Sequence, residues 1–179
     1  VSQPFRLYTI NKVSYHIAQN LGNRNNITDS VYYQGVHIYS DEPLRFKPKT
    51  IVDANFIQPN SKFSDFSRNM TSRSITALQS FSYPGIEFIK TPGDTTGSLL
   101  DAKVTLIPLK KGQLNPALNF THSNIQQVGI EGTLGVTFRN VFRGAENLTL
   151  GLHGNIGSSA SRYRSETNTF FDILEYGVD

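Results

Sequence analysis

The second half of the chain alternates apolar and polar side chains with a period of two residues. Runs of this kind cover 114–122, 129–139, 140–157 and, less regularly, 170–179. Because successive side chains of a β-strand point to opposite faces, this period predicts strands with one apolar and one polar face. The residues expected on the apolar face are Leu114, Leu118, Phe120, Ile130, Leu134, Val136, Phe138, Leu148, Leu150, Leu152 and Ile156.

The first half of the chain mixes this period with helical spacing. Alternation predicts extended segments over 5–17, 32–40, 83–90 and 98–110. The stretch between the first two is rich in Asn, Gly and Asp, which favour turns, so we expect an inserted loop or hairpin there.

Two helices are predicted between the second and third of these extended segments. The first lies within 46–57 and begins at Pro48, whose missing amide hydrogen is not needed in the first turn of a helix. The second lies within 61–81, where Ser64 is expected to cap the helix and Asp65 suits its positive end. Its expected apolar stripe is Phe66, Met70, Ala77, Leu78 and Phe81. Residues 5–110 therefore predict a small α+β unit with two helices over one face of a sheet.

Two kinds of surroundings explain the alternation after residue 113. A soluble β-sandwich strand alternates, and so does a strand that crosses a bilayer. Three features favour the bilayer: one face is aliphatic with Phe, the other is small and polar, and the runs reach about nine to eleven residues, the length that crosses a bilayer at a tilt. The smallest such barrels need about eight strands. We therefore expect the chain to be a fragment that ends inside an unfinished barrel.

Composition and charge narrow the function classes. The 17 basic and 14 acidic residues among 179 are scattered along the chain and give a net charge of +3, which makes nucleic acid a poor expected partner. The sequence has no apolar run of about 18 residues, so it predicts no transmembrane helix. The absence of Cys excludes a disulfide framework and a thiolate metal site, although it does not exclude export.

The candidate catalytic and metal-binding residues lack the spacing that their chemistry needs. The four histidines, at 16, 37, 122 and 153, form no HxH or HExxH pattern, so no metal site is expected. The sequence has no GxSxG elbow and no paired carboxylates around a predicted cleft. We therefore expect no enzyme and no cofactor. Arg139, Arg143 and Glu146 around Gly144 form either a functional cluster or the charged end of a strand at the water interface.

The order of these parts resembles the BamA/TamA family of outer-membrane assembly factors. The segments that carry the resemblance are LRFKPKTIVDANFIQPNSKFS (44–64), ALQSFSYPGIEFI (77–89), DAKVTLIPLKK (101–111) and, most specifically, GVTFRNVFRGAENLTLGLHG (135–154). The closest match is to the TamA-like proteins of Bacteroidota. The chain departs from the family in having Pro59-Asn60-Ser61 where Gly is usual, and in a longer insertion at 18–40.

The resemblance implies a POTRA-like β-α-α-β-β unit followed by the first antiparallel strands of a transmembrane β-barrel. The expected domains are a periplasmic unit over 1–111, with an insertion at about 18–45, and barrel strands over 112–179. The resemblance also implies a bacterial outer-membrane location and upstream POTRA units. The implied function is the insertion of β-barrel proteins into that membrane. The implied partners are unfolded β-barrel clients and outer-membrane lipid. A periplasm-spanning TamB-like protein is a further candidate partner.

Three sets of site residues follow from this reading. If the sheet order follows the POTRA pattern, an edge strand offers its free backbone to clients by strand addition; its residues are Ile86, Glu87, Phe88 and Ile89. The family further implies a barrel seam strand that opens to template a client strand, formed by Leu118, Asn119, Phe120 and Thr121. The residues expected to face lipid are Leu134, Val136, Phe138, Leu148, Leu150 and Leu152.

Two other functions stay open at the level of the sequence. A two-partner secretion transporter shares the POTRA unit and the barrel but exports a dedicated partner. A soluble cell-surface binding module would instead have a β-sandwich in its C-terminal half, and it would need no detergent.

Overall fold

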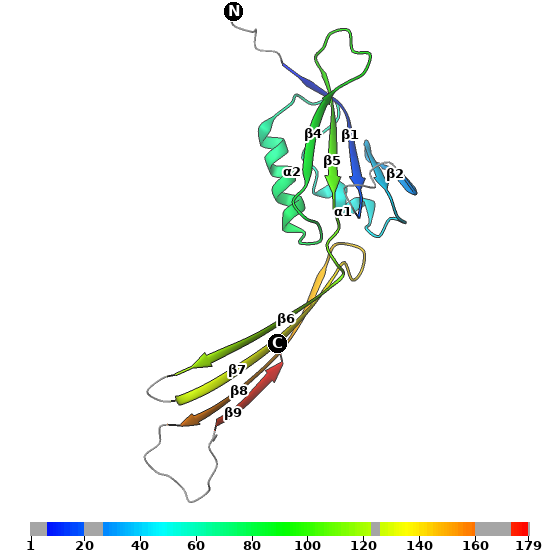
Figure 1. The fold of residues 1–179 in the computed structure, drawn as a ribbon. Coiled ribbons are helices and arrows are strands. Elements are labelled where there is room, and N and C mark those ends of the chain that lie inside the picture. The colour runs from blue at the N-terminus through cyan, green and yellow to red at the C-terminus, as the bar shows by residue number, and fades with distance from the viewer. Residues whose placement is uncertain (1–6, 20–26, 123–125, 160–172, 179) are drawn as a thin grey trace, which may run out of the picture. The chain divides into compact units, whose positions relative to one another are not determined.

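A computed structural model describes residues 7–19, 27–122, 126–159 and 173–178. The chain forms two compact units (Figure 1). The first contains Val1–Lys110 together with Arg139–Asn147, and the second contains Lys111–Phe138 and Leu148–Asp179. The assignment of 1–111 to a periplasmic unit and of 112–179 to barrel strands stays a prediction, and the structure places Arg139–Asn147 in the first unit.

The first unit contains a mixed five-stranded sheet with the order β2-β3-β1-β5-β4 (Figure 1). Strand β1 pairs in parallel with both of its neighbours, whereas the β2–β3 and β4–β5 pairs are antiparallel. The strands are β1 (Thr9–Ile17), β2 (Asp29–Tyr33), β3 (Val36–Ser40), β4 (Gly85–Lys90) and β5 (Leu99–Leu106).

The expected insertion contributes two strands to this sheet. The two residues between β2 and β3, Gln34 and Gly35, have φ values of 48° and 82°. Positive φ at both positions produces a type I′ turn, whose twist matches that of the flanking strands. Strand β3 then pairs with β1, with Val36 opposite Val13. The insertion therefore widens the sheet and occupies the side of β1 that β5 leaves open.

Both predicted helices are present, as α1 (Pro48–Asp53) and α2 (Asp65–Ala77). Ser64 occupies the N-cap position of α2, but its side chain makes no capping hydrogen bond, so that part of the prediction is wrong.

The predicted apolar stripe of α2 is also wrong in part. Phe66 is 71% exposed, and the residues buried within the helix are Thr71, Ser72 and Ile75. The hydroxyl of Thr71 accepts a hydrogen bond from the Phe56 amide at 2.9 Å and donates to the Ser67 carbonyl at 2.8 Å. Because these bonds satisfy the hydroxyl, a polar residue can occupy the buried face.

The core of the first unit lies between the sheet and the two helices. Phe46 packs against Phe81 with ring centroids 4.4 Å apart. Tyr15 is fully buried, and burial raises the pKa of its hydroxyl. Other core residues include Ile10, Val13, Val36, Ile38, Ile51, Ile75, Ala102, Val104 and Leu106.

The second unit is a four-stranded sheet with the order β6-β7-β8-β9. Its strands are β6 (Gly112–Thr121), β7 (Gln126–Arg139), β8 (Asn147–Ser159) and β9 (Ile173–Val178). They overlap the four segments of period-two alternation. Residues 140–146, which the third segment included, lie outside β8, and residues 170–172 and 179 of the fourth segment lie outside the described residues.

Candidate functional edges and faces

Strand β4 lies at one end of the strand order in the first unit. The amide of Thr91 donates to the Leu99 carbonyl at 3.1 Å. Because hydrogen-bonded pairs alternate along an antiparallel ladder, this bond fixes which residues of β4 bond to β5. The N–H and C=O groups of Ile86, Phe88 and Lys90 therefore point away from β5, toward the open edge.

The side chains of β4 differ between the two faces of the sheet. Ile86 and Phe88 pack against the core, and Phe88 meets Phe63 edge-on with ring centroids 4.8 Å apart. Glu87 and Ile89 lie on the opposite face, where Ile89 is 49% exposed. Core contacts thus hold β4 while its outer backbone groups lie at the edge. Whether this edge binds a partner stays a prediction.

The predicted seam strand, β6, lies at one end of the second sheet. Leu118 and Phe120 are 71% and 78% exposed, and Asn119 lies opposite Glu131 on β7. Thr121 pairs with Gly129 through the backbone. The opening of this strand to clients is likewise a prediction that the structure does not test.

The register of β6 and β7 places apolar residues opposite one another. Leu114 pairs with Val136, and Phe120 pairs with Ile130. The alternate positions are polar, and the hydroxyls of Thr137 and Thr149 lie 3.2 Å apart between β7 and β8. One face of the second sheet is therefore apolar and the other polar.

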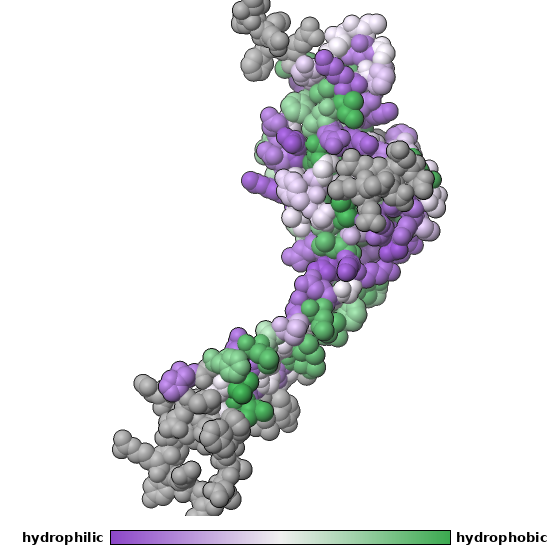
Figure 2. Space-filling model, in the orientation of Figure 1, coloured by the Kyte–Doolittle hydropathy of each residue, from purple (hydrophilic) through white to green (hydrophobic). Residues whose placement is uncertain are grey.

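The apolar face is exposed to solvent in the structure. Among its predicted lipid-facing members, Leu134, Phe138, Leu148, Leu150 and Leu152 are between 39% and 53% exposed, and Val136 is half-buried. Hydrophobic residues gather along β6–β8 in the space-filling view (Figure 2). An exposed contiguous apolar face of this kind marks a surface that meets a partner or a membrane.

The segment Arg139–Asn147, called here the 139–147 loop, joins β7 to β8 along the chain and belongs to the first unit. Three of its residues other than Gly have left-handed backbone, with φ of 58° at Asn140, 67° at Arg143 and 62° at Ala145. This conformation costs about 1–2 kcal/mol for a residue such as Ala. The loop therefore needs contacts that offset its strain.

Hydrogen bonds to the main chain of the first unit provide these contacts. The Lys47 amide donates to the Arg143 carbonyl at 2.7 Å, and the Arg143 guanidinium donates to the Leu44 carbonyl at 2.8 Å. The Ser80 hydroxyl donates to the Ala145 carbonyl at 3.3 Å. Ala145 is 6% exposed and belongs to the core. The loop is thus an integral part of the first unit.

The charged side chains noted in the sequence, Arg139, Arg143 and Glu146, hold the 139–147 loop in place through hydrogen bonds to main-chain groups. Arg139 donates to the carbonyls of Gln79 at 3.0 Å and Lys110 at 3.3 Å. Arg143 bonds to the main chain as described above, and Glu146 accepts from amides within the loop. A structural role, which neither sequence interpretation included, therefore accounts for all three side chains.

Glu146 closes the loop on itself. Its carboxylate accepts hydrogen bonds from the amides of Gly144 at 2.9 Å and Phe142 at 3.3 Å. Backbone hydrogen bonds, first from its own amide and then from these two, hold the pKa of Glu146 below its usual value, and the charge of Lys47 adds to the effect. A Cβ at Gly144 would collide with this carboxylate.

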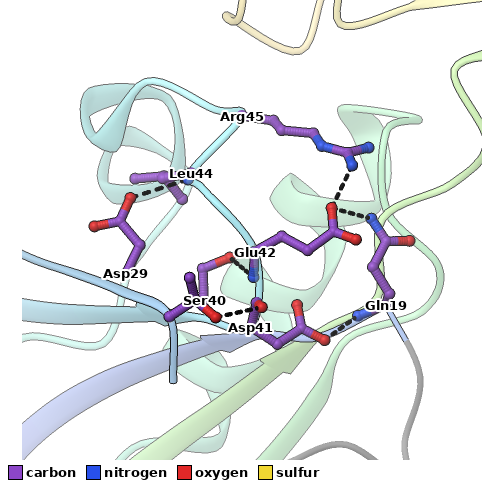
Figure 3. A network of polar contacts seen from close by, with 8 residues as sticks. Gln19, Asp29, Ser40, Asp41, Glu42, Leu44 and Arg45 are labelled. Carbon is purple, nitrogen blue, oxygen red and sulfur yellow. Dashed lines mark hydrogen bonds and ion pairs between the residues drawn. The ribbon is translucent and has the colours of Figure 1, made fainter. Parts of the chain in front are cut away.

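A second polar network fixes the chain where it leaves β3 (Figure 3). The Gln19 amide donates to Asp41 at 2.9 Å, and the Gln19 side chain donates to Glu42 at 3.4 Å. Glu42 also pairs with Arg45. Asp29, from β2, accepts from the Leu44 amide at 3.0 Å. The carboxylates therefore stabilise the connection between the inserted hairpin and α1.

The described residues contain no group of three or more His, Cys, Asp or Glu side chains that could hold a metal ion. His16 instead lies beside Tyr39, and His37 beside Tyr32, on the open face of the first sheet. Neither described helix is both long and apolar enough to cross a membrane.

The sequence matches no family model and no curated protein. Among solved structures, the chain is similar to BamA from Haemophilus ducreyi lacking POTRA domains 1–3, with 11% identity, a TM-score of 0.44 and 84% of the chain covered. It is also similar to CdiB from Acinetobacter baumannii, with 10% identity, a TM-score of 0.46 and 89% coverage. The chain spans 22% and 40% of these two proteins. Neither is described as a TamA-like protein of Bacteroidota, so that narrower resemblance stays a prediction.

Proposed function

We propose that this chain is part of an assembly factor that inserts β-barrel proteins into the bacterial outer membrane. In this proposal the second sheet lies in the membrane with its apolar face toward lipid. The first unit is a POTRA-like domain in the periplasm, and it binds unfolded clients by strand addition at β4. The TamA-like subtype and a TamB-like partner are finer expectations that come from the sequence resemblance.

The observation that carries the proposal is the exposed apolar face of the second sheet. A soluble β-sandwich would cover this face with a second sheet. Within the described residues, however, the second unit is one four-stranded sheet, and Leu118 and Phe120 on β6 are 71% and 78% exposed. A lipid surface would cover these side chains while the polar face met water, as in outer-membrane barrels.

The open edge of β4 supports the client-binding part of the proposal. Main-chain hydrogen bonds to an added strand need little side-chain identity, so one edge can receive many client sequences. No nucleotide or cofactor is needed, because the folding of a client strand in lipid satisfies backbone groups that would be costly to leave unpaired there.

Client folding by the protein reconstituted in phospholipid vesicles tests the proposal. The substrate is an unfolded outer-membrane β-barrel protein, and folding is followed by the gel shift of the folded barrel. Ile86→Pro removes an outward amide from β4 without removing a bond to β5, so it should slow client folding. Lys90→Pro also removes an outward amide, but Lys90 is exposed and does not pack in the core. If both variants slow client folding, the cause is lost strand addition and not lost packing.

Ser30→Pro is the matched control. The two-residue turn makes Tyr33 and Val36 a hydrogen-bonded pair, so alternation along β2 directs the Ser30 backbone away from β3. Ser30 therefore carries an outward amide at the opposite edge of the same sheet, and its substitution should leave client folding unchanged. Unchanged folding with Ile86→Pro and Lys90→Pro would refute strand addition at β4.

A further inference from the structure

The 139–147 loop holds two adjacent apolar side chains in solvent. Val141 is 40% exposed, and Phe142 is 71% exposed. Asn140 and Arg143 on either side have left-handed backbone, and their side chains donate hydrogen bonds to main-chain carbonyls of the first unit. Strained backbone persists where the surrounding contacts enforce it, and such sites are often functional. The exposure of Phe142 is therefore a property of a firmly held loop.

Three segments of the first unit hold this loop. They precede α1, follow α2 and follow β5, and the residues that bond to the loop include Arg45, Lys47, Ser80 and Lys110. The three basic residues among them are exposed. The charge of Lys47 acts on the Glu146 carboxylate, which accepts a hydrogen bond from the Phe142 amide at 3.3 Å. A positive charge therefore lies near the exposed apolar pair.

Positive charge exceeds negative charge around the loop. The loop and the segments that hold it contain the cationic residues Arg45, Lys47, Lys110, Arg139 and Arg143. The nearby carboxylates have partners already, since Glu146 accepts from loop amides and Glu42 pairs with Arg45. Anionic headgroups attract basic clusters, and aromatic side chains favour the boundary between headgroups and acyl chains. The combination therefore fits the surface of a membrane that contains anionic lipid.

Chain connectivity keeps Phe142 near the proposed membrane boundary. Phe138, near the end of β7, belongs to the apolar face that the proposed function places in lipid. Phe142 follows it by four residues, so the two Cα atoms are no more than about 14 Å apart. The headgroup region on each side of a bilayer is roughly 5–8 Å thick. A side chain tethered this closely to a lipid-facing residue can reach the headgroups.

We propose that the 139–147 loop and the basic residues that hold it form a lipid-headgroup contact of the first unit, with Phe142 inserted at the acyl boundary. This inference rests on the proposed membrane location of the second sheet. Val141 adds apolar area to the contact, and Lys47 and Lys110 attract the phosphates of anionic phospholipids. The loop conformation then has a role, because it presents Phe142 outward while Ala145 stays in the core.

Tryptophan reporters in the full chain test this contact. Phe142→Trp is compared with Phe66→Trp, because both Phe residues are 71% exposed in the first unit. Asn147 of the loop donates to the carbonyl of Leu78 at the end of α2, whereas Phe66 lies in the first turn, about 18 Å away along the helix. The vesicles contain phosphatidylcholine and phosphatidylglycerol with bromine near the carbonyl end of the acyl chains. Phe142→Trp should be quenched and its emission should shift to the blue, whereas Phe66→Trp should show neither change.

Charge dependence separates a headgroup contact from mere proximity to the bilayer. One cation near an anionic surface changes binding by roughly fivefold. In the Phe142→Trp chain, Lys47→Gln should therefore weaken the quenching in the anionic vesicles and have little effect in pure phosphatidylcholine. Lys62→Gln removes the same charge from a residue that pairs with Thr9, so it should leave the quenching unchanged.

The results distinguish this contact from the proposed function. Quenching of Leu150→Trp by bromine near the methyl end of the acyl chains, without quenching of Phe142→Trp, would overturn the headgroup contact but not the membrane location of the second sheet. Quenching of neither reporter would overturn both. Equal quenching of Phe142→Trp and Phe66→Trp, or an equal effect of Lys47→Gln and Lys62→Gln, would also overturn the headgroup contact.

Discussion

Asn140 should determine the stability of the 139–147 loop. Its backbone has φ of 58°, a conformation that Asn tolerates better than Ala. Its side chain accepts a hydrogen bond from the Ala145 amide at 3.1 Å and donates one to the Arg45 carbonyl at 3.0 Å. Substitution therefore affects both the backbone conformation and two contacts.

The expected magnitudes separate these two effects. Each side-chain hydrogen bond contributes about 0.5–1.5 kcal/mol, and left-handed backbone costs Ala about 1–2 kcal/mol. Asn140→Ala should therefore destabilise the docked loop by about 2–5 kcal/mol. Asn140→Gly keeps the backbone conformation accessible and should cost only about 1–3 kcal/mol.

Hydrogen exchange measures this loss of stability at two amides. The Ala145 amide donates to the Asn140 side chain, and the Lys47 amide donates to the Arg143 carbonyl. The free energy of opening at both amides should fall in the order wild type, Asn140→Gly, Asn140→Ala. If both variants protect the two amides as the wild type does, the loop is not held by these contacts and the reasoning fails.

Two further predictions concern the hairpin of β4 and β5 and the buried face of α2. Hydrogen bonds from the Thr96 hydroxyl and, to a smaller extent, from the Leu99 amide lower the pKa of Asp94 to about 2. The stability that this carboxylate contributes should therefore be complete above about pH 4 and be lost as the pH falls through about 2. Hydrogen exchange of the Leu99 amide should follow that pH dependence in the wild type and not in Asp94→Asn. Ile75→Ala should destabilise the first unit by about 2–5 kcal/mol in urea unfolding, whereas Phe66→Ala should cost less than about 0.5 kcal/mol because Phe66 is 71% exposed. If Phe66→Ala destabilised the first unit more than Ile75→Ala, the apolar stripe expected from the sequence would be correct and the buried face described here would be wrong.

Local patterns predicted most elements of the fold because each depends on neighbours in sequence. Period-two alternation located β6, β7 and β8, and Pro48 marked the start of α1. Alternation also separated the two faces of the second sheet, since the side chain direction in a strand follows from position alone.

Contacts between distant segments could not be predicted in this way. The Asn-, Gly- and Asp-rich composition indicated an inserted loop or hairpin, but the pairing of β3 with β1 depends on a register that this local pattern does not encode. Residues 140–146 were included in an alternating run, whereas in the structure the Asn140 side chain donates a hydrogen bond to the Arg45 carbonyl, 95 residues earlier. The buried face of α2 was missed because Thr71 is polar, and its burial depends on the Phe56 amide.

The contact of the apolar face with lipid is the central claim, and tryptophan fluorescence tests it directly. The chain contains no Trp, so a single introduced Trp reports one position. Leu150→Trp and Thr149→Trp place the reporter on the apolar and polar faces of β8. In vesicles with brominated acyl chains, the account predicts strong quenching of Leu150→Trp and weak quenching of Thr149→Trp. Equal quenching of the two, or quenching of neither, would contradict the proposed membrane location of this sheet.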